Sequence, residues 1–301
     1  MKKNMSKKYF EANTADELYK KAIEEVSKNP EYIVRPRGME IKEILNVELV
    51  LKDPRNSLIR SEARKLNYAF AAMEKLQYLS GNSDSERLCF YNSNFANFKN
   101  DYNYYDGDYG TRIRYWLEHI IALLKKDPDS RQAVYTIFGV QDRHSSKDIP
   151  CTISHQFFLR EGKLHMTAYM RSNDLLWGFP YDINGFVFIQ EFLANVLGVE
   201  LGTYTHKVGS LHLYTEREFD LLKVLSNSKL SDIRNPEIEK GIDFKDYLSD
   251  IELLLKIEKL YRKKNTLKAS ELSKHLPISL HKYLEVLKET IAKKLQKEEH
   301  I

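Results

Sequence analysis

The spacing of apolar residues along the chain predicts alternating helices and strands. Leu18, Ala22 and Val26 recur at helical intervals, so we expect an amphipathic helix near the start. Segment 41–51 is rich in β-branched and aliphatic residues and is typical of a strand. A second helix is expected from about residue 61 to 79. The first eighty residues are therefore expected to form two helices and a strand.

The middle of the chain combines strands with one irregular segment. Residues 92–108 are crowded with Asn, Asp, Tyr and Phe and have no clear period, which suggests a functional loop. A helix is expected at 115–126. Three successive strands are expected at 133–138, 153–159 and 164–169. A short turn at Glu161-Gly162 joins the last two as a hairpin.

The later part of the chain adds a buried helix and a helical extension. Segment 183–197 is apolar on most sides and stops at Gly198, while 204–214 returns to strand character. Beyond it the composition shifts to Lys, Glu and Leu with helical spacing. We therefore expect an α+β fold with a mixed or mostly antiparallel sheet backed by helices. The main unit is expected at 1–230 and the extension at 231–301.

Composition and charge exclude several classes of protein. The 301 residues are 42% hydrophobic, enough for a sizeable core. No apolar stretch approaches the roughly 20 residues that cross a bilayer, so we expect a cytoplasmic protein without a membrane partner. Cys89 and Cys151 form no zinc or disulfide pattern. A formal charge of +4 is too small to indicate nucleic-acid binding and suits an anionic small substrate.

Cys151 is the first candidate for chemistry. Most lone cysteines in β-rich regions are small core residues, but Cys151 follows a proline and has several arginines nearby in the sequence. Positive charge lowers the pKa of a thiol into the reactive range, so a nucleophile is expected. Arg171-Ser172 supplies a forked cation and a hydroxyl, the groups expected at a phosphate monoester, although the same pair occurs on many surfaces.

Other polar positions have both a structural and a functional interpretation. Ser210, His212 and Tyr214 alternate along a predicted strand and so lie on one face, as structural or as binding residues. Glu74 has apolar helix neighbours, a setting in which a carboxylate usually faces solvent. Asp182 stands at the entrance of the apolar helix, where a plain N-cap is the simple interpretation.

Taken together, the motifs follow one order along the chain. In that order they are Tyr109-Gly110, Asp129-Ser130-Arg131, Pro150-Cys151, Arg171-Ser172, Asp174, Gly178, Pro180, Gly209, His212 and Tyr214. This order resembles the thymidylate synthase family, including its pyrimidine hydroxymethylase branch, over about residues 30–225. The resemblance implies a thymidylate-synthase-like fold with the helical extension outside it.

The resemblance also implies roles for these positions. Cys151 would add to C6 of a pyrimidine nucleotide, so that C5 becomes nucleophilic toward the methylene carbon of 5,10-methylenetetrahydrofolate. Arg171, Ser172 and an N-terminal arginine, Arg35 in preference to Arg37, would hold the 5′-phosphate of the nucleoside monophosphate. The resemblance also implies a homodimer with shared active sites, in which Arg131 would bind the phosphate of the neighbouring subunit. His212 and Tyr214 would bind the sugar hydroxyl, and Asp174 and Gly178 the folate. Glu74 would belong to the water network that moves protons, and Tyr109 would lie beside the nucleophile.

One departure from the family pattern bears on the base. Asp182 stands where thymidylate synthases carry an asparagine. An amide accepts from uracil N3–H and donates to O4, whereas a carboxylate accepts from the 4-amino group of cytosine. Asp182 therefore favours cytosine, and we expect it to share a proton with N3, which makes C6 more electrophilic. The strings 170–174 (MRSND) and 209–212 (GSLH) resemble deoxycytidylate hydroxymethylase in particular.

Three functions follow from this comparison. The leading hypothesis is folate-dependent 5-hydroxymethylation of dCMP, or of CMP, in which water captures the exocyclic methylene. The alternative within the same fold is a thymidylate synthase, which reduces that methylene and converts dUMP to dTMP. A non-catalytic nucleotide-binding or RNA-binding protein is the third, but intact Cys151, Arg171, Asp174 and His212 argue against it.

Overall fold

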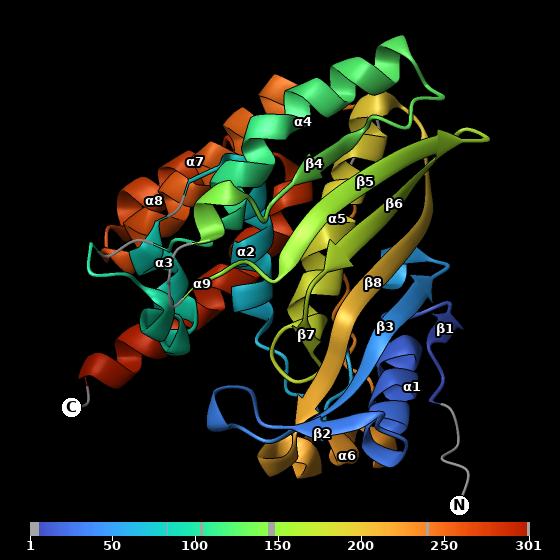
Figure 1. Cartoon of the computed structure of the whole chain (residues 1–301). Helices are drawn as coiled ribbons and strands as arrows, with labels where there is room; N and C mark the ends of the chain where they lie inside the picture. The colour runs from blue at the N-terminus through green and yellow to red at the C-terminus, as the bar shows by residue number, and fades with distance from the viewer. Residues whose placement is uncertain (1–5, 83, 103–104, 144–147, 239–240, 300–301) are drawn as a thin grey trace, which may run out of the picture.

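The computed structural model describes residues 6–82, 84–102, 105–143, 148–238 and 241–299, which form one mixed sheet with helices packed against it (Figure 1). The described strands are β1 (Tyr9–Ala12), β2 (Tyr32–Val34), β3 (Ile41–Leu51), β4 (Val134–Thr136), β5 (Thr152–Arg160), β6 (Lys163–Met170), β7 (Asn173–Asp174) and β8 (Glu200–Tyr214). The described α-helices are α1 (Ala15–Lys28), α2 (Tyr68–Ser80), α3 (Ser85–Tyr91), α4 (Tyr109–Lys126), α5 (Phe179–Leu197), α6 (Glu218–Ser226), α7 (Phe244–Arg262), α8 (Thr266–Ser273) and α9 (Ile278–Glu299). None of these helices is long and apolar enough to span a membrane.

The long strand β8 organises the sheet. The strand order is β1-β3-β8-β6-β5-β4, with β2 paired to β3 and β7 paired to β8. β8 runs antiparallel to β3 and parallel to β6 and β7. It buries Tyr204, His206 and Val208, since alternate residues of a strand point to the same face. The mixed sheet that the sequence predicts is confirmed.

Helix α5 packs on this sheet and is buried along almost its whole length. Figure 1 shows α5 behind β5 and β6, and α2 and α4 also contact it. The Nε2 of Gln190 donates to the carbonyls of Leu164 and Thr203, at 2.9 and 3.1 Å, and so joins α5 to the backbone of β6 and β8. These hydrogen bonds fix the middle of α5 against the sheet.

The predicted elements are confirmed, but several helices begin elsewhere. The strand at 41–51 is β3 with the predicted bounds, and Glu161-Gly162 forms the turn between β5 and β6. The helix expected from residue 61 begins only at Tyr68, after its N-cap Asn67. The carboxylate of Asp16 binds the backbone N–H of Ser61 and holds that segment outside the helix.

The other differences also lie at helix starts. α4 begins at Tyr109 because Asp108 accepts from the backbone of its first turn. α5 begins at Phe179 with Gly178 as its N-cap, so the N-cap interpretation of Asp182 is wrong. The expected loop at 92–108 contains the 3₁₀ turn Ser93–Phe98 and follows α3, which is too short for its period to be recognised.

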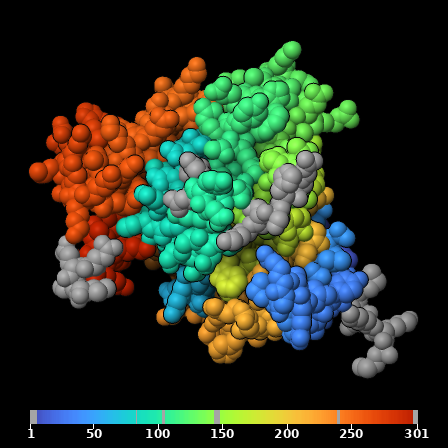
Figure 2. All heavy atoms as spheres, turned by 60° about the vertical axis from the view of Figure 1, so that its left-hand side comes forward, coloured from blue at the N-terminus to red at the C-terminus, as the bar shows by residue number. Residues whose placement is uncertain are grey.

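The C-terminal helices share the core of the rest of the chain. α7 and α9 pack against α2, and Figure 2 shows the C-terminal helices forming one side of the molecule. Ile251, Leu254 and Leu287 are fully buried in the same hydrophobic cluster as the sheet and α5. The division expected at residue 230 therefore coincides with a change of composition and does not separate two cores.

A buried ionic cluster joins α7 to α3. Glu258 is fully buried, and its Oε1 accepts from the Tyr91 hydroxyl at 2.9 Å and from Arg262 Nε at 2.6 Å. Its Oε2 lies 3.7 Å from Nε of Arg87, whose guanidinium also lies 3.4 Å from Asp84. Removing one member of such a cluster leaves the others as uncompensated buried charges.

Replacing Glu258 tests this connection. We expect Glu258→Ala to lower the free energy of unfolding by about 3–5 kcal/mol, because two arginines lose their buried partner. Urea unfolding followed by circular dichroism measures the change. As the control, Glu289→Ala removes an exposed partner of Lys293 and should cost less than about 1 kcal/mol. Equal losses in the two variants would contradict the prediction.

Candidate active site

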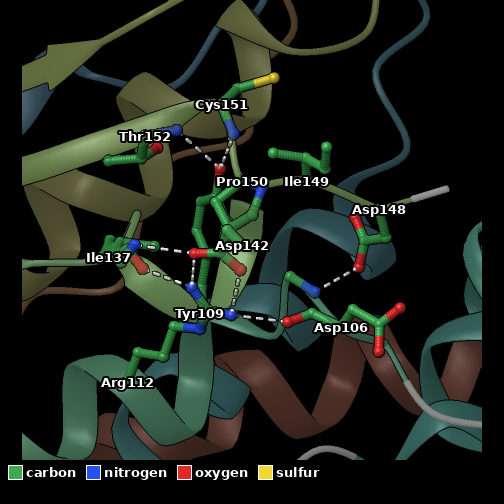
Figure 3. A network of polar contacts seen from close by, with 12 residues as sticks. Asp106, Tyr109, Arg112, Ile137, Asp142, Asp148, Ile149, Pro150, Cys151 and Thr152 are labelled. Atoms are coloured by element: carbon green, nitrogen blue, oxygen red, sulfur yellow. Dashed lines mark hydrogen bonds and ion pairs between the residues drawn. The ribbon is translucent and has the colours of Figure 1, made fainter. Parts of the chain in front are cut away.

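Cys151 is held at the start of β5 by Tyr109, the first residue of α4. The backbone N–H groups of Cys151 and Thr152 both donate to the Tyr109 hydroxyl oxygen, at 3.1 and 3.0 Å. In Figure 3 the sulfur of Cys151 points away from Tyr109. The Tyr109 ring clusters with those of Tyr78 of α2 and Phe186 of α5, the three centroids lying 6.1 to 6.4 Å from one another. Tyr109 therefore positions the nucleophile through its backbone and leaves the thiol free to react.

A second set of contacts, also in Figure 3, fixes the chain around this point. Arg112, one turn along α4 from Tyr109, pairs with Asp142 at 2.6 and 2.8 Å and donates to the carbonyl of Asp106 at 2.6 Å. Asp148, just before the Cys151 segment, accepts from the backbone of Gly107 at 2.9 Å. Residues at and just before the N-terminal end of α4 thus hold two parts of the chain that precede Cys151.

Arg171 lies beside the nucleophile, as the sequence predicts. Its Nε and Nη2 donate to the carbonyls of Pro150 and Ile149, both at 2.9 Å. A guanidinium has five N–H donors in a planar fork, so the remaining donors can bind an anion. Ser172 follows directly and is partly exposed. The predicted anion clamp therefore adjoins Cys151.

The electrostatics of Cys151 differ from the expectation. Burial raises the pKa of its thiol, the guanidinium of Arg171 lowers it only in part, and the carboxylate of Asp182 raises it further. The expectation that neighbouring arginines lower the pKa of the Cys151 thiol is therefore wrong for the single chain, in which this pKa is raised. Loss of water around the sulfur outweighs the single nearby cation.

Two largely enclosed carboxyl groups, Glu74 on α2 and Asp182 on α5, interact electrostatically. Burial raises the pKa of Glu74 well above its ordinary value, and the charge of Asp182 adds to this. Burial also raises the pKa of Asp182 to about 7, although a hydrogen bond from Asn173 opposes the shift. The environment of Glu74 thus favours its protonated form, and Asp182, with a pKa of about 7, is poised to take up or release a proton.

A hydrogen-bonded chain of buried side chains begins at Asp182. Asn173 Nδ2 donates to Asp182 Oδ2 at 2.7 Å, and Asn173 Oδ1 accepts from His206 Nε2 at 2.9 Å. His206 Nδ1 then accepts from the Tyr204 hydroxyl at 2.7 Å. Burial lowers the pKa of His206 to about 3, so its ring is neutral. The amide of Asn173 turns its Nδ2 toward Asp182 because a carboxylate accepts hydrogen bonds and cannot donate them.

The sequence interpretation missed Asn173, His206 and Tyr204 as site residues. Tyr204 and His206 occupy alternate positions on the buried face of β8, and Asn173 lies in the MRSND string. Polar residues in an alternating row of a core strand were the available signal. Their role becomes visible only when β7 and β8 are placed beside the first turn of α5.

Gly178 and Asp174 shape the turn that carries this chain of contacts. A Cβ on Gly178 would lie 2.6 Å from Asn173 Nδ2 and 3.2 Å from Asp182 Oδ2, so only glycine fits. Asp174 accepts from the backbone N–H groups of Leu176 and Gly178, both at 2.9 Å. Both residues predicted at the folate therefore also hold the start of α5 in place.

His212 and Tyr214 lie on one face at the end of β8, as predicted. Their rings pack edge to face with centroids 5.6 Å apart. His212 Nδ1 donates to the Ser210 carbonyl at 3.2 Å, which leaves Nε2 available to a ligand. Trp177, 46% exposed, packs against Tyr214 at 5.3 Å between centroids. The end of β8 thus offers polar and aromatic groups at the surface.

The remaining predicted arginines are placed differently. Arg35 pairs with Glu40 at 2.7 Å and its side chain is 72% exposed. Arg37 instead lies close enough to Tyr214 to lower the pKa of that phenol, which burial raises. Of the two N-terminal arginines, Arg37 is thus the one that interacts with Tyr214, while the preference for Arg35 stays a prediction. Arg131 is exposed before β4, where its carbonyl accepts from Gln156.

A family model described as thymidylate synthase matches residues 17–269. This chain belongs to the thymidylate synthase family. The match begins before the span of the sequence motifs and continues past it into α8. A thermostable thymidylate synthase A from Bacillus subtilis has the same fold, with a TM-score of 0.63 over 77% of this chain and 91% of that one. At 20% identity this likeness concerns the fold alone.

Two curated relatives of this family member are similar in sequence. A deoxyuridylate hydroxymethyltransferase of Bacillus phage SP01 is 34% identical over 226 residues, 69% of this chain and 59% of the relative. A putative thymidylate synthase of Methanocaldococcus jannaschii is 38% identical over 112 residues, 36% of this chain and 50% of the relative. The chain thus spans about half to three fifths of the length of these relatives.

The site of this thymidylate synthase family member combines a nucleophile, an anion clamp and two carboxyl groups with raised pKa values. Members of the family bind a pyrimidine nucleoside monophosphate. Among the described residues, no cluster of three His, Cys, Asp or Glu side chains is placed to hold a metal.

The raised pKa of Asp182 predicts a pH-dependent effect of its replacement. The unfolded carboxyl loses its proton near its ordinary pKa, whereas the folded one keeps it to about pH 7, so Asp182 weakens stability as pH rises through this window. We expect Asp182→Asn to raise the free energy of unfolding at pH 8, on the order of 2–4 kcal/mol, and by less at pH 5. Urea unfolding at both pH values measures it.

The exposed carboxyl of Asp129 supplies the control for this prediction. Its side chain is 95% exposed, and Asp129→Asn should leave the difference between the two pH values unchanged. If Asp182→Asn changed stability equally at pH 5 and pH 8, an ordinary pKa for Asp182 would be the correct description.

Proposed function

We propose that this member of the thymidylate synthase family is an active one-carbon transferase that hydroxymethylates C5 of a cytidine nucleoside monophosphate, dCMP or CMP. One observation carries the choice of base. A partly buried carboxyl group with a pKa of about 7, Asp182, occupies the position at which the synthases of the family carry asparagine.

A neutral carboxylic acid is complementary to the edge of cytosine. Its carbonyl oxygen accepts from the 4-amino group and its hydroxyl donates to N3, whereas uracil presents a donor at N3 and an acceptor at O4. Because burial raises the pKa of Asp182 to about 7, the carboxyl group can hold the proton that N3 requires. A proton shared with N3 draws electrons from C6 and favours attack by Cys151.

Asn173 supports this arrangement by fixing which way Asp182 faces. Its amide N–H donates to Asp182 Oδ2 at 2.7 Å. Because Oδ2 then acts as an acceptor, the proton of the neutral carboxyl group is favoured on Oδ1. His206 holds the other end of the amide, so Asn173 cannot turn over without losing two buried hydrogen bonds. The donor and acceptor of the base-reading carboxyl are therefore defined before a ligand binds.

The residues present also fit a folate co-substrate, 5,10-methylenetetrahydrofolate. Trp177 exposes an indole face beside Tyr214, suited to a flat aromatic ligand. Glu74 Oε2 is buried without a hydrogen-bond partner among the described residues, as expected of a group that faces ligand or water. When bound, this co-substrate supplies a one-carbon unit at the oxidation level of formaldehyde.

Each protein group then has a defined task in the proposed reaction. The Cys151 thiolate adds to C6, and the carbanion character passes to C5, which makes C5 the nucleophile. Arg171, Ser172 and Arg37 hold the phosphate, and His212 and Tyr214 bind the sugar. C5 loses its proton and tetrahydrofolate leaves, so that an exocyclic methylene remains on the base. Water adds to this methylene and Cys151 leaves C6, which releases the hydroxymethyl product, while Glu74 donates and recovers protons nearby.

A homodimer with shared active sites would complete this arrangement. Burial raises the pKa of Cys151 despite Arg171, so a more reactive thiol needs a further cation nearby. Arg131 is exposed on the loop before β4 and is therefore free to reach a neighbouring subunit. We assign it to the phosphate of the partner's site.

Two other functions remain as rivals within the same site. The phage relative is named a deoxyuridylate hydroxymethyltransferase, which favours dUMP as the alternative substrate for the same chemistry. Reductive methylation of dUMP, the thymidylate synthase reaction, is the second rival. A non-catalytic nucleotide-binding or RNA-binding protein is less consistent with a nucleophile that has both its clamp and its carboxyl groups in place.

Release of tritium from C5 distinguishes these functions. With folate present, we expect release from labelled dCMP or CMP, a hydroxymethylated product and no absorbance rise from dihydrofolate. Cys151→Ala should reduce release by about 10³-fold or more. Asp182→Asn should shift the ratio of kcat/KM for dCMP over dUMP by about 10- to 100-fold toward dUMP, because the base-reading pair is reversed.

The contrary outcomes separate the rivals. Preferred release from dUMP with a hydroxymethyl product would identify the substrate of the phage relative, and formation of dihydrofolate would identify a synthase. Release from no labelled nucleotide, with nucleotide binding retained, would identify a binding protein. An unchanged base preference in Asp182→Asn would remove the role assigned to that carboxyl group.

Mixed dimers test the shared site. Arg131→Ala and Cys151→Ala subunits should each be nearly inactive alone. After unfolding and refolding as an equimolar mixture, half of the dimers are mixed, and each contains one intact site, so about a quarter of the wild-type activity should return. Mixing Arg171→Ala with Cys151→Ala is the matched control, since these residues lie in one chain's site and their mixture should regain no intact site.

A further inference from the structure

A second cavity lies between the main unit and the C-terminal helices. Its volume is about 330 Å³, and it is lined by residues of α2, α5, α9 and the segment 232–236. This volume falls within the range of small-molecule sites. None of the residues assigned to the candidate active site lines it, although Lys75, one of its walls, directly follows Glu74 in α2.

Two buried hydrogen-bond donors line the cavity and lack partners among the described residues. Asn184 is 1% exposed, and its Nδ2 makes no hydrogen bond while its Oδ1 accepts from Asn235 Nδ2 at 2.9 Å. Tyr283 is 3% exposed, and its hydroxyl is also without a partner. Buried polar groups in folded proteins are normally satisfied. Donors on two different helices therefore indicate an acceptor that both could share.

A buried cation adds a charge to these donors. Lys75 is 2% exposed, and its Nζ donates to Asn235 Oδ1 at 2.6 Å. The ammonium also lies over the rings of Phe188 and Tyr283, 5.7 and 5.9 Å from their centroids. No carboxylate of the described residues lies within salt-bridge distance of it: Glu191 pairs with Arg55 at 3.6 Å and acts on Lys75 only from farther away. Burial lowers the pKa of Lys75 to about 7, and the charge of Glu191 opposes this shift in part. A buried ammonium normally has an anionic partner.

The rest of the lining is apolar inside and charge-balanced at the exposed rim. The apolar and aromatic wall consists of Leu58, Tyr68, Ala71, Ala72, Pro236 and Val286. At the rim, Arg234 and Lys282 are balanced by Asp232 and Glu285. The net positive charge of the lining is thus that of Lys75, inside the cavity and beside the unpartnered donors.

We propose that this cavity binds a small organic anion, whose carboxylate or phosphate group contacts Lys75, Asn184 and Tyr283 and whose flat apolar body lies against Tyr68 and α9. These donors on α2, α5 and α9 line the same cavity, so one bound anion would supply the acceptor that Asn184 and Tyr283 lack and a charged partner for Lys75. This ligand site is separate from the nucleotide and folate sites of the proposed function.

Phenyl phosphate and benzoate are suitable probes, because each joins one kind of anion to a flat ring. Isothermal titration of the full chain carrying Arg171→Ala excludes binding at the anion clamp of the active site. We expect one probe to bind this variant with a Kd below about 1 mM. Inorganic phosphate and phenol, which carry only one of the two features, should each bind at least about tenfold more weakly.

Substitutions then place the binding at this cavity. In the Arg171→Ala background, Lys75→Met should weaken binding by at least about tenfold, and Tyr283→Phe, which removes one oxygen, by about three- to tenfold. Lys282→Met at the rim is the matched control and should change binding less than about twofold. The thermal midpoint of each variant shows that it folds, and Tyr283→Phe retains the test if Lys75→Met does not fold.

The preferred anion identifies the chemistry of the ligand. Tighter binding of phenyl phosphate indicates a phosphate monoester, and tighter binding of benzoate indicates a carboxylate. The proposal is overturned if neither probe binds at roughly 10 mM, if inorganic phosphate binds as tightly as the better probe, or if Tyr283→Phe and a folded Lys75→Met bind it like the parent variant.

Discussion

The hydrogen bond from Asn173 to Asp182 is the constraint on which the site depends. It holds the partly buried carboxyl group of Asp182, whose pKa burial raises, and it engages one of the two carboxyl oxygens. The bond exists because β7 and β8 bring Asn173 beside His206, while the first turn of α5 brings Asp182. The absence of a side chain at Gly178 permits this close approach. Sheet and helix must therefore be packed correctly before the base-reading group acquires its properties.

The nucleophile is held by the same packing from the opposite side. Tyr109 binds the backbone at Cys151 and stacks on Phe186 of α5, and Phe186 also packs against His206 at 6.4 Å between centroids. α5 thus connects the support of the nucleophile with the support of the base-reading carboxyl. A shift of this helix would move both groups together, which keeps their separation suited to one pyrimidine ring.

The sequence predicts those features that are local or that belong to a motif. Arg171 contacts the segment that carries Cys151, and β3 has the predicted bounds. Properties that arise from tertiary contacts could not be predicted. The pKa of Cys151 is raised because burial exceeds the effect of Arg171, and burial is not visible in a string of residues. The N-terminal arginine is a similar case, because Glu40 engages Arg35 and only the backbone turn at Arg37 directs that side chain toward Tyr214.

The C-terminal extension reaches the site indirectly, through the packing of aromatic and polar side chains. Glu258 of α7 binds Tyr91 at the end of α3, and the Tyr91 carbonyl accepts from Asn67, the N-cap of α2. The Asn67 backbone N–H donates to the hydroxyl of Tyr181, the neighbour of Asp182. Each step is a direct contact between buried or half-buried groups, so the extension supports the start of α2 and the first turn of α5 together. We infer that the helices after residue 230 belong to the structural framework of the active site, even though none of the residues assigned to the chemistry lies in them.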